Sequence, residues 1–93
     1  MTLPDERTRA LIWAGGFLIE LARDESLPLS VRQQAVMIAR HFPTYEDVSN
    51  MAMFRHSSGL GIGLEDPGTV DLADGCPQGP LWRSTRLAWP EAP

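Results

Sequence analysis

The residues of this 93-residue chain best suited to chemistry are one cysteine, Cys76, and two histidines, His41 and His56. A reactive cysteine needs a basic neighbour or a helix N-terminus that lowers its pKa. Cys76 stands in Asp-Gly-Cys-Pro, without a basic neighbour in the sequence. Neither histidine has a second ligand at the four-residue spacing of helical metal sites. The sequence therefore predicts a noncatalytic protein with no metal and no cofactor, and an enzyme built on Cys76 is the least favoured alternative.

Charge and composition narrow the kinds of partner. The formal net charge is -4, and the eight Lys and Arg residues form no basic block, which argues against nucleic acid. The chain shows no secretory signal and no apolar run of roughly 20 residues, so we expect a cytoplasmic protein without a membrane span. A single cysteine excludes an internal disulfide. A hydrophobic content of 43% is typical of one small globular domain.

Three helices are predicted in the first 55 residues, at Leu3 to Arg23, Val31 to His41 and Tyr45 to Arg55. Capping residues stand before them at Thr2, Ser30 and Thr44, each followed three residues later by Asp or Gln. The short links predict an antiparallel hairpin of the first two helices. The fold class is therefore mainly α, with a three-helix core at 1–56. The Gly- and Pro-rich residues 57–93 form the rest of the same domain, either as a short β-hairpin or as a loop laid across the helices.

The first helix is apolar around much of its circumference. One face is predicted to be the core side: Leu3, Ala10, Leu11, Ala14, Phe17, Leu18 and Leu21. Ile12, Trp13 and Ile19 lie on another side, which is either covered by the rest of the domain or used for self-association. Gly15 and Gly16 are costly inside a helix, and the favoured reason for them is the close approach of another backbone, with a local kink as the alternative.

Two tryptophans and two arginines lie close together in the last part of the chain. Trp82 and Trp89 flank Arg83 and Arg86, so they either pin the tail to the helices or form an exposed patch for a protein partner. The candidate protein-interface residues are Ile12, Trp13, Ile19, Trp82, Arg83, Arg86 and Trp89.

Several short motifs resemble a known family. The opening Met1-Thr2-Leu3-Pro4-Asp5-Glu6-Arg7-Thr8-Arg9-Ala10 fits the signature M-T-x-P-x-E-R-T-R-A, and Leu27-Pro28 and Arg40-His41-Phe42-Pro43 follow. Together they resemble a family of small proteobacterial proteins of unassigned function, over residues 1–48. The resemblance implies a helical N-terminal core and no catalytic residue to carry over.

The expected function is that of a small noncatalytic protein-binding or regulatory protein, whose partner is another protein or a second copy of itself. Two alternatives stay open. One is a regulator that contacts nucleic acid through residues 45–55, because residues 31–55 have the outline of a helix-turn-helix, although Arg55 is the only cation on that helix. The other is an inhibitor of a host defence or regulatory complex.

Overall fold

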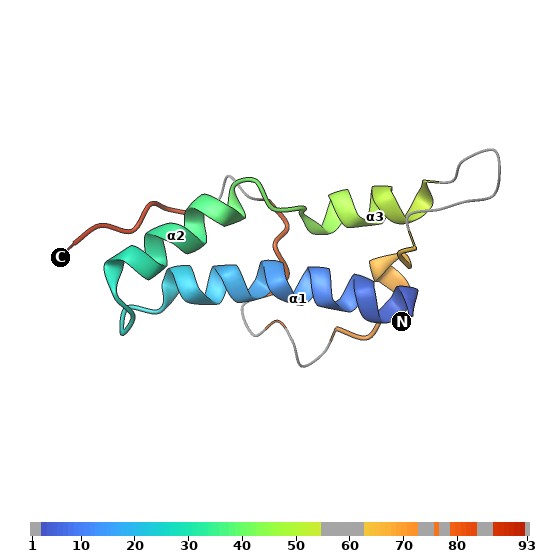
Figure 1. Cartoon of the computed structure of the whole chain (residues 1–93), viewed down its shortest axis with the longest axis horizontal. Coiled ribbons are helices and arrows are strands. Elements are labelled where there is room, and N and C mark those ends of the chain that lie inside the picture. Colours follow the sequence, from blue (N-terminus) through green and yellow to red (C-terminus); the bar gives the residue numbers. More distant parts are fainter. Residues whose placement is uncertain (1–2, 55–62, 73–75, 77–78, 84–86, 93) are drawn as a thin grey trace.

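Three helices follow one another along the chain, and the first is the longest (Figure 1). The computed structural model describes residues 3–54, 63–72, 76, 79–83 and 87–92. Helix α1 spans Pro4–Arg23, α2 spans Leu29–Ala39 and α3 spans Tyr45–Met53, and a 3-10 turn, η1, spans Pro67–Thr69. The mainly helical fold predicted from the sequence is confirmed. Within the described part of residues 57–93 the chain forms a loop across the helices and contains no strand.

The helix starts show which capping predictions hold. The side chain of Thr44 accepts a hydrogen bond from the Asp47 N–H at 3.2 Å, and the Asp47 carboxylate accepts one from the Thr44 N–H at 2.9 Å, as predicted. The predicted Ser30 cap is wrong, because α2 already begins at Leu29. Pro28 takes the cap position, and its carbonyl accepts hydrogen bonds from the N–H groups of Val31 and Arg32.

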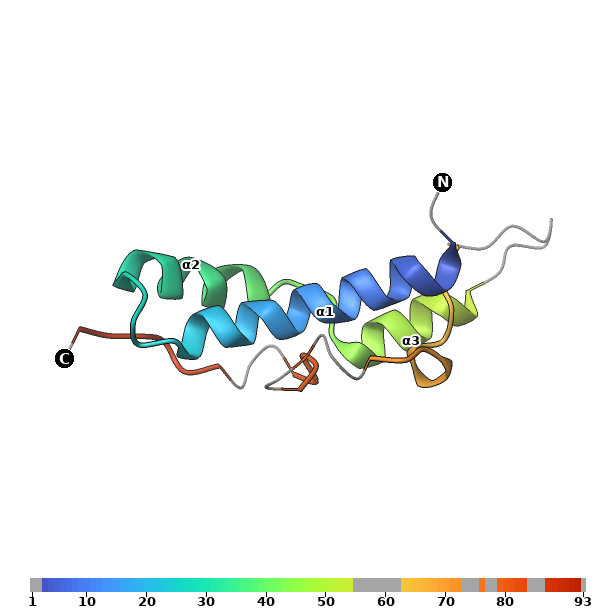
Figure 2. The same cartoon turned by 90° about the horizontal axis from the view of Figure 1, so that it is seen from below.

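Two helices share the length of α1. In Figures 1 and 2, α2 lies along the C-terminal half of α1 as an antiparallel hairpin, and α3 lies along its N-terminal half. Each pair encloses its own core. The hairpin core consists of Ile19, Ala22, Ala35, Val36, Ala39, Leu81 and Leu87. The α1–α3 core consists of Ile12, Val48, Ala52 and Leu64.

The face of α1 that turns inward differs from the predicted one. Ile12 and Ile19 are only 3% and 7% exposed, so they are core residues and not an interface for self-association. Phe17, predicted to be buried, is 56% exposed, and Leu3 is exposed as well. The reason is that Cys76, Gly79 and Leu81 also pack on α1, on the side of its two glycines, and that Leu87 joins the core with Ile19. The buried positions therefore follow the stripe Thr8, Ile12, Gly15, Gly16, Ile19 and Ala22.

The glycine pair in α1 permits a close crossing, as predicted. A Cβ on Gly15 would lie 3.0 Å from the Leu81 Cβ, and one on Gly16 would lie 2.9 Å from the Cys76 Sγ and 3.2 Å from the Gly79 carbonyl oxygen. Gly79 itself has a φ of +85°, a conformation that favours glycine, and its N–H donates to the Cys76 carbonyl. The later part of the chain thus lies directly on the backbone of α1.

The molecule is elongated, with principal extents of 54 × 24 × 22 Å and a radius of gyration of 14.7 Å. A compact chain of this length has a radius of gyration of about 12 Å. Such a shape encloses less of its apolar surface. Ten large hydrophobic side chains are exposed among the described residues: Leu3, Trp13, Phe17, Val31, Met37, Ile38, Met53, Phe54, Trp82 and Trp89.

Candidate protein-binding surface

Residues 79–83 bring two of the predicted interface residues to the start of α3. Leu81 is buried in the hairpin core, and its carbonyl accepts a hydrogen bond of 2.9 Å from the Tyr45 N–H. That N–H belongs to the first turn of α3, where no partner exists within the helix. The bond therefore satisfies α3 and fixes the position of Trp82 and Arg83 beside it.

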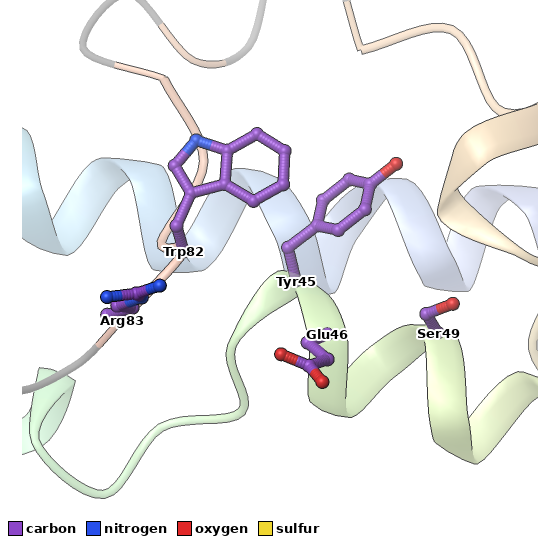
Figure 3. Close-up of a pocket in the computed structure, with 5 residues that line it drawn as sticks. All are labelled: Tyr45, Glu46, Ser49, Trp82 and Arg83. Atoms are coloured by element: carbon purple, nitrogen blue, oxygen red, sulfur yellow. The ribbon is translucent and has the colours of Figure 1, made fainter.

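Trp82 rests on a ring that is itself held in place. The ring centroids of Tyr45 and Trp82 are 4.5 Å apart, with an angle of 42° between the ring planes. Tyr45 also packs against the α1–α3 core, whereas Trp82 is 58% exposed. Figure 3 shows the two rings side by side, one from α3 and one from residues 79–83. A large aromatic surface is thus presented to solvent in a defined orientation.

The two rings border a hollow with a volume of about 490 Å³, lined by Tyr45, Glu46, Ser49, Trp82 and Arg83. We call it the Tyr45–Trp82 hollow. Glu46 and Arg83 are exposed and supply one negative and one positive charge at its edge (Figure 3). The rings offer a flat apolar surface, Glu46 accepts hydrogen bonds, and Arg83 donates them. These groups suit binding of a ligand that carries both apolar and polar groups.

Trp82 and Arg83 also line a second, smaller hollow. It has a volume of about 140 Å³, and Ile19, Arg23, Pro80, Leu81 and Leu87 complete its lining. The exposed indole and guanidinium thus border two depressions, which adds to the surface that a partner can contact.

Of the other predicted interface residues, Ile19 lines the smaller hollow, but neither Trp13 nor Trp89 lines either hollow. Trp13 has the Arg9 guanidinium 5.7 Å from its ring centroid, and Trp89 has that of Arg40 at 5.4 Å. Each of these two indoles therefore has a cation on one face within the protein. Arg86 lies outside the described residues, and Ile12 and Ile19 belong to the two cores.

Sequence reasoning missed Tyr45, Glu46 and Ser49 as part of the site. Tyr45 stands three residues before Val48, on the inward side of α3, which is the only local signal of its role. No local pattern indicates that Leu81 meets its N–H, because the two residues are far apart in the chain.

Of the residues first considered for chemistry, Cys76 has ordinary surroundings, and His56 lies outside the described residues. The Cys76 thiol donates a weak hydrogen bond to the Ile12 carbonyl at 3.8 Å, and burial raises its pKa, which keeps it protonated and poorly nucleophilic. No group of three or more His, Cys, Asp or Glu side chains gathers as a metal site within the described ranges. None of the helices described here has the length and apolar character needed to span a membrane.

Comparison with protein-family models finds no match, and comparisons with curated proteins and with solved structures find none either. The resemblance of residues 1–48 to a proteobacterial family therefore stays a prediction.

Proposed function

We propose that the chain is a noncatalytic protein-binding domain that holds a segment of a partner protein in the Tyr45–Trp82 hollow. The exposed indole of Trp82, fixed on Tyr45, is the observation that carries the proposal. Trp, Tyr and Arg are the residues that most often dominate binding energy at protein interfaces. A fixed aromatic side chain also loses little conformational entropy when a partner covers it.

The lining of the hollow suggests the chemistry of the partner. An apolar side chain of the partner covers the rings, while its neighbouring amide or charged groups bind Glu46 and Arg83. An extended polypeptide carries apolar side chains next to polar backbone groups, so it can supply both kinds of contact. Nucleic acid fits less well, because the exposed charges of Tyr45–Met53 are the carboxylates of Glu46 and Asp47, which repel phosphate.

The proposal extends to a regulatory role in the bacterial cytoplasm. A domain of 93 residues that binds without chemistry acts by blocking or recruiting what it binds. The net charge of -4 favours solubility of the molecule, while the partner site carries one charge of each sign.

Retention of proteins from a bacterial lysate by the immobilised chain tests the proposal, with Trp82→Ala as the disruptive variant and Trp89→Ala as the matched control. Both indoles are exposed, so both variants are expected to keep the helical circular dichroism of the wild type. We expect a protein that wild type and Trp89→Ala retain and Trp82→Ala does not. With that partner purified, loss of Trp82 is expected to weaken binding by about 30-fold, the size of an interface hot spot.

Two results would contradict the proposal. One is equal retention of every captured protein by Trp82→Ala and wild type. The other is a purified partner whose affinity depends on Trp89 and not on Trp82, since that would place binding at the tail instead of the hollow.

A further inference from the structure

Another hollow, with a volume of about 470 Å³, is lined by residues of both α1 and α3, which lie side by side in Figures 1 and 2. Its lining in the described part of the chain consists of Arg7, Ala10, Leu11, Pro43, Met51 and Leu64. We call it the Arg7 hollow. None of these residues lines the Tyr45–Trp82 hollow. Its volume lies within the range of about 300 to 1,000 Å³ that is usual for pockets that bind small molecules.

The wall of the Arg7 hollow is mostly apolar. Leu64 is only 6% exposed and belongs to the α1–α3 core, and Leu11 and Met51 pack against that core. Ala10 is exposed and contributes only a methyl group to the wall. An apolar group placed in the hollow would therefore extend the α1–α3 core and remove apolar surface from water, which is favourable.

Arg7 is the one charged residue among the described residues that line this hollow. It stands three and four residues before Ala10 and Leu11, so the three side chains share one side of α1. The neighbouring carboxylate of Glu6 is engaged elsewhere, because it accepts a hydrogen bond from the Leu3 N–H. Across the described ranges of the chain, no carboxylate forms an ion pair with the Arg7 guanidinium.

A glycine beside the wall makes room for this guanidinium. A Cβ on Gly63 would lie only 2.8 Å from the Arg7 Nη1, so the guanidinium packs where other residues carry a side chain. Gly63 has a φ of +81°, a conformation that favours glycine, and it directly precedes Leu64 of the wall. The positive charge is therefore held next to the apolar surface of the hollow.

We propose that the Arg7 hollow binds a small amphipathic carboxylate, with its hydrocarbon body on the apolar wall and its carboxylate on Arg7. A guanidinium binds a carboxylate through two parallel hydrogen bonds. Its charge selects an anion over a cation, and the wall selects a ligand with an apolar body. In a molecule of net charge -4, one guanidinium suits a head group with a single negative charge better than a phosphate with two.

Octanoate, an eight-carbon carboxylate, is the probe that tests the proposal. The hollow is open to solvent and offers one charged contact, so we expect a dissociation constant on the order of 1 mM. In an NMR titration, the amide signals of Leu11, Met51 and Leu64 are expected to shift. Those of Val36 and Ala39 in the hairpin core are expected to stay in place.

Arg7→Gln separates the role of the charge from that of the wall. We expect this variant to bind octanoate about tenfold more weakly, because the charged contact is lost. Its affinity for octan-1-ol, which has the same chain length and no charge, is expected to stay unchanged. Arg40→Gln is the matched control, since Arg40 is an exposed arginine that does not line the hollow and the change in charge is the same. This control is expected to bind octanoate like the wild type.

Ala10→Phe tests the wall. The larger side chain would occupy part of the hollow, so binding of both octanoate and octan-1-ol is expected to fall. Because Ala10 is exposed, the variant is expected to keep the helical circular dichroism of the wild type. Unchanged octanoate binding in this variant would place the ligand outside the hollow.

Three further results would overturn the proposal. One is that octanoate at about 10 mM shifts none of the amide signals of the wall. Another is that the wild type binds octan-1-ol as tightly as octanoate, because an apolar surface alone would then explain binding. The last is that Arg7→Gln weakens both ligands equally, since Arg7 would then only support the shape of the hollow.

This inference does not depend on the proposed function. Octanoate is titrated into the purified chain, whereas the Tyr45–Trp82 hollow is tested by retention of a partner protein. Failure of one experiment therefore leaves the other intact.

Discussion

The two halves of α1 are held by different interactions. The C-terminal half packs through small and branched apolar side chains, with Ile19 and Ala22 against Ala35, Val36 and Ala39 of α2. The N-terminal half adds directional bonds to its apolar core. The hydroxyl of Thr8, which is fully buried, donates to the Glu65 carbonyl and accepts from the Glu65 N–H, each at 2.8 Å. The Arg9 Nε donates to the Asp71 carbonyl at 3.1 Å.

This difference follows the distance along the chain. Helix α2 begins a few residues after α1 ends, so the loop that joins them costs little entropy to close. Glu65 is 57 residues from Thr8, and Asp71 is 62 residues from Arg9. Such remote segments approach α1 with irregular backbone, whose N–H and C=O groups need partners when they meet a buried surface. The near neighbour is held mainly by apolar packing, with one hydrogen bond from the Arg32 Nε to the Ala22 carbonyl, whereas the distant segments add several hydrogen bonds.

The largest effect is expected from truncating the two core isoleucines. Ile19→Ala and Ile12→Ala each should lower the free energy of unfolding by about 3 kcal/mol, because each opens a cavity in one of the two cores. Phe17→Ala should cost far less, since Phe17 is exposed. Urea unfolding followed by circular dichroism measures all three. Because a small domain has little stability to lose, Ile19→Val and Ile12→Val provide milder versions. Equal losses for Phe17→Ala and Ile19→Ala would mean that the inward face of α1 is assigned wrongly.

The next largest effect is expected at Gly15, where the two halves of α1 meet. Gly15→Val should destabilise the protein by about 2 kcal/mol. The new Cβ would lie 3.0 Å from the Leu81 Cβ, so the backbone at Leu81 would have to move away from α1. Ala10→Val, at an exposed position of the same helix, serves as the control and should cost well under 1 kcal/mol. Urea midpoints of the two variants decide the point. If Gly15→Val is as stable as Ala10→Val, the close crossing does not exist.

A smaller effect is expected where hydrogen bonds hold the N-terminal half. Thr8→Val keeps the shape of the side chain but removes both bonds to Glu65, and should cost about 1.5 kcal/mol. Hydrogen exchange should show faster exchange of the Glu65 amide, with the amides of α2 unchanged. Thr69→Val is the control, because the Thr69 hydroxyl donates to the Asp66 carbonyl at an exposed site. Faster exchange throughout α2 would contradict the separation of the two halves.

The smallest effect concerns the turn that joins α1 to α2. The hydroxyl and the backbone N–H of Ser26 both donate hydrogen bonds to the Asp24 carboxylate. These bonds, the one from the hydroxyl first, lower the pKa of Asp24 below its ordinary value of 3.8. Because the folded pKa is lowered, the stabilising contribution is present above the unfolded pKa and is lost as the pH falls through the folded one. NMR titration should therefore give a midpoint below 3.8, and Ser26→Ala should raise it. An unchanged midpoint in Ser26→Ala would remove Ser26 as the cause.

The sequence was a good guide to features set by near neighbours. The existence of three helices, the capping box at Thr44 and the close approach at Gly15 and Gly16 each depend on local periodicity, local hydrogen bonds or the missing Cβ. The start of α2 was misplaced because Pro28 holds the cap position that the pattern assigned to Ser30.

Features that depend on distant segments were missed or wrong. The inward face of α1 is set jointly by α2, α3 and the remote residues Cys76, Leu81 and Leu87, and a helix that is apolar around most of its circumference does not reveal which side they cover. Trp82 and Arg83 were predicted to be interface residues from their types alone, and this stays a prediction. Their neighbours Tyr45, Glu46 and Ser49 were not, because the Tyr45–Leu81 hydrogen bond joins positions with no shared local pattern.

That hydrogen bond has a mechanical consequence. The Leu81 carbonyl accepts the hydrogen bond of the Tyr45 N–H, and Trp82 is the next residue along the chain. Any load that draws the indole away from the surface is therefore transmitted to the first turn of α3, which would begin to fray from Tyr45. A force on one side chain thereby unwinds the end of a helix. The hydrogen-exchange rate of the Tyr45 amide would report this unwinding.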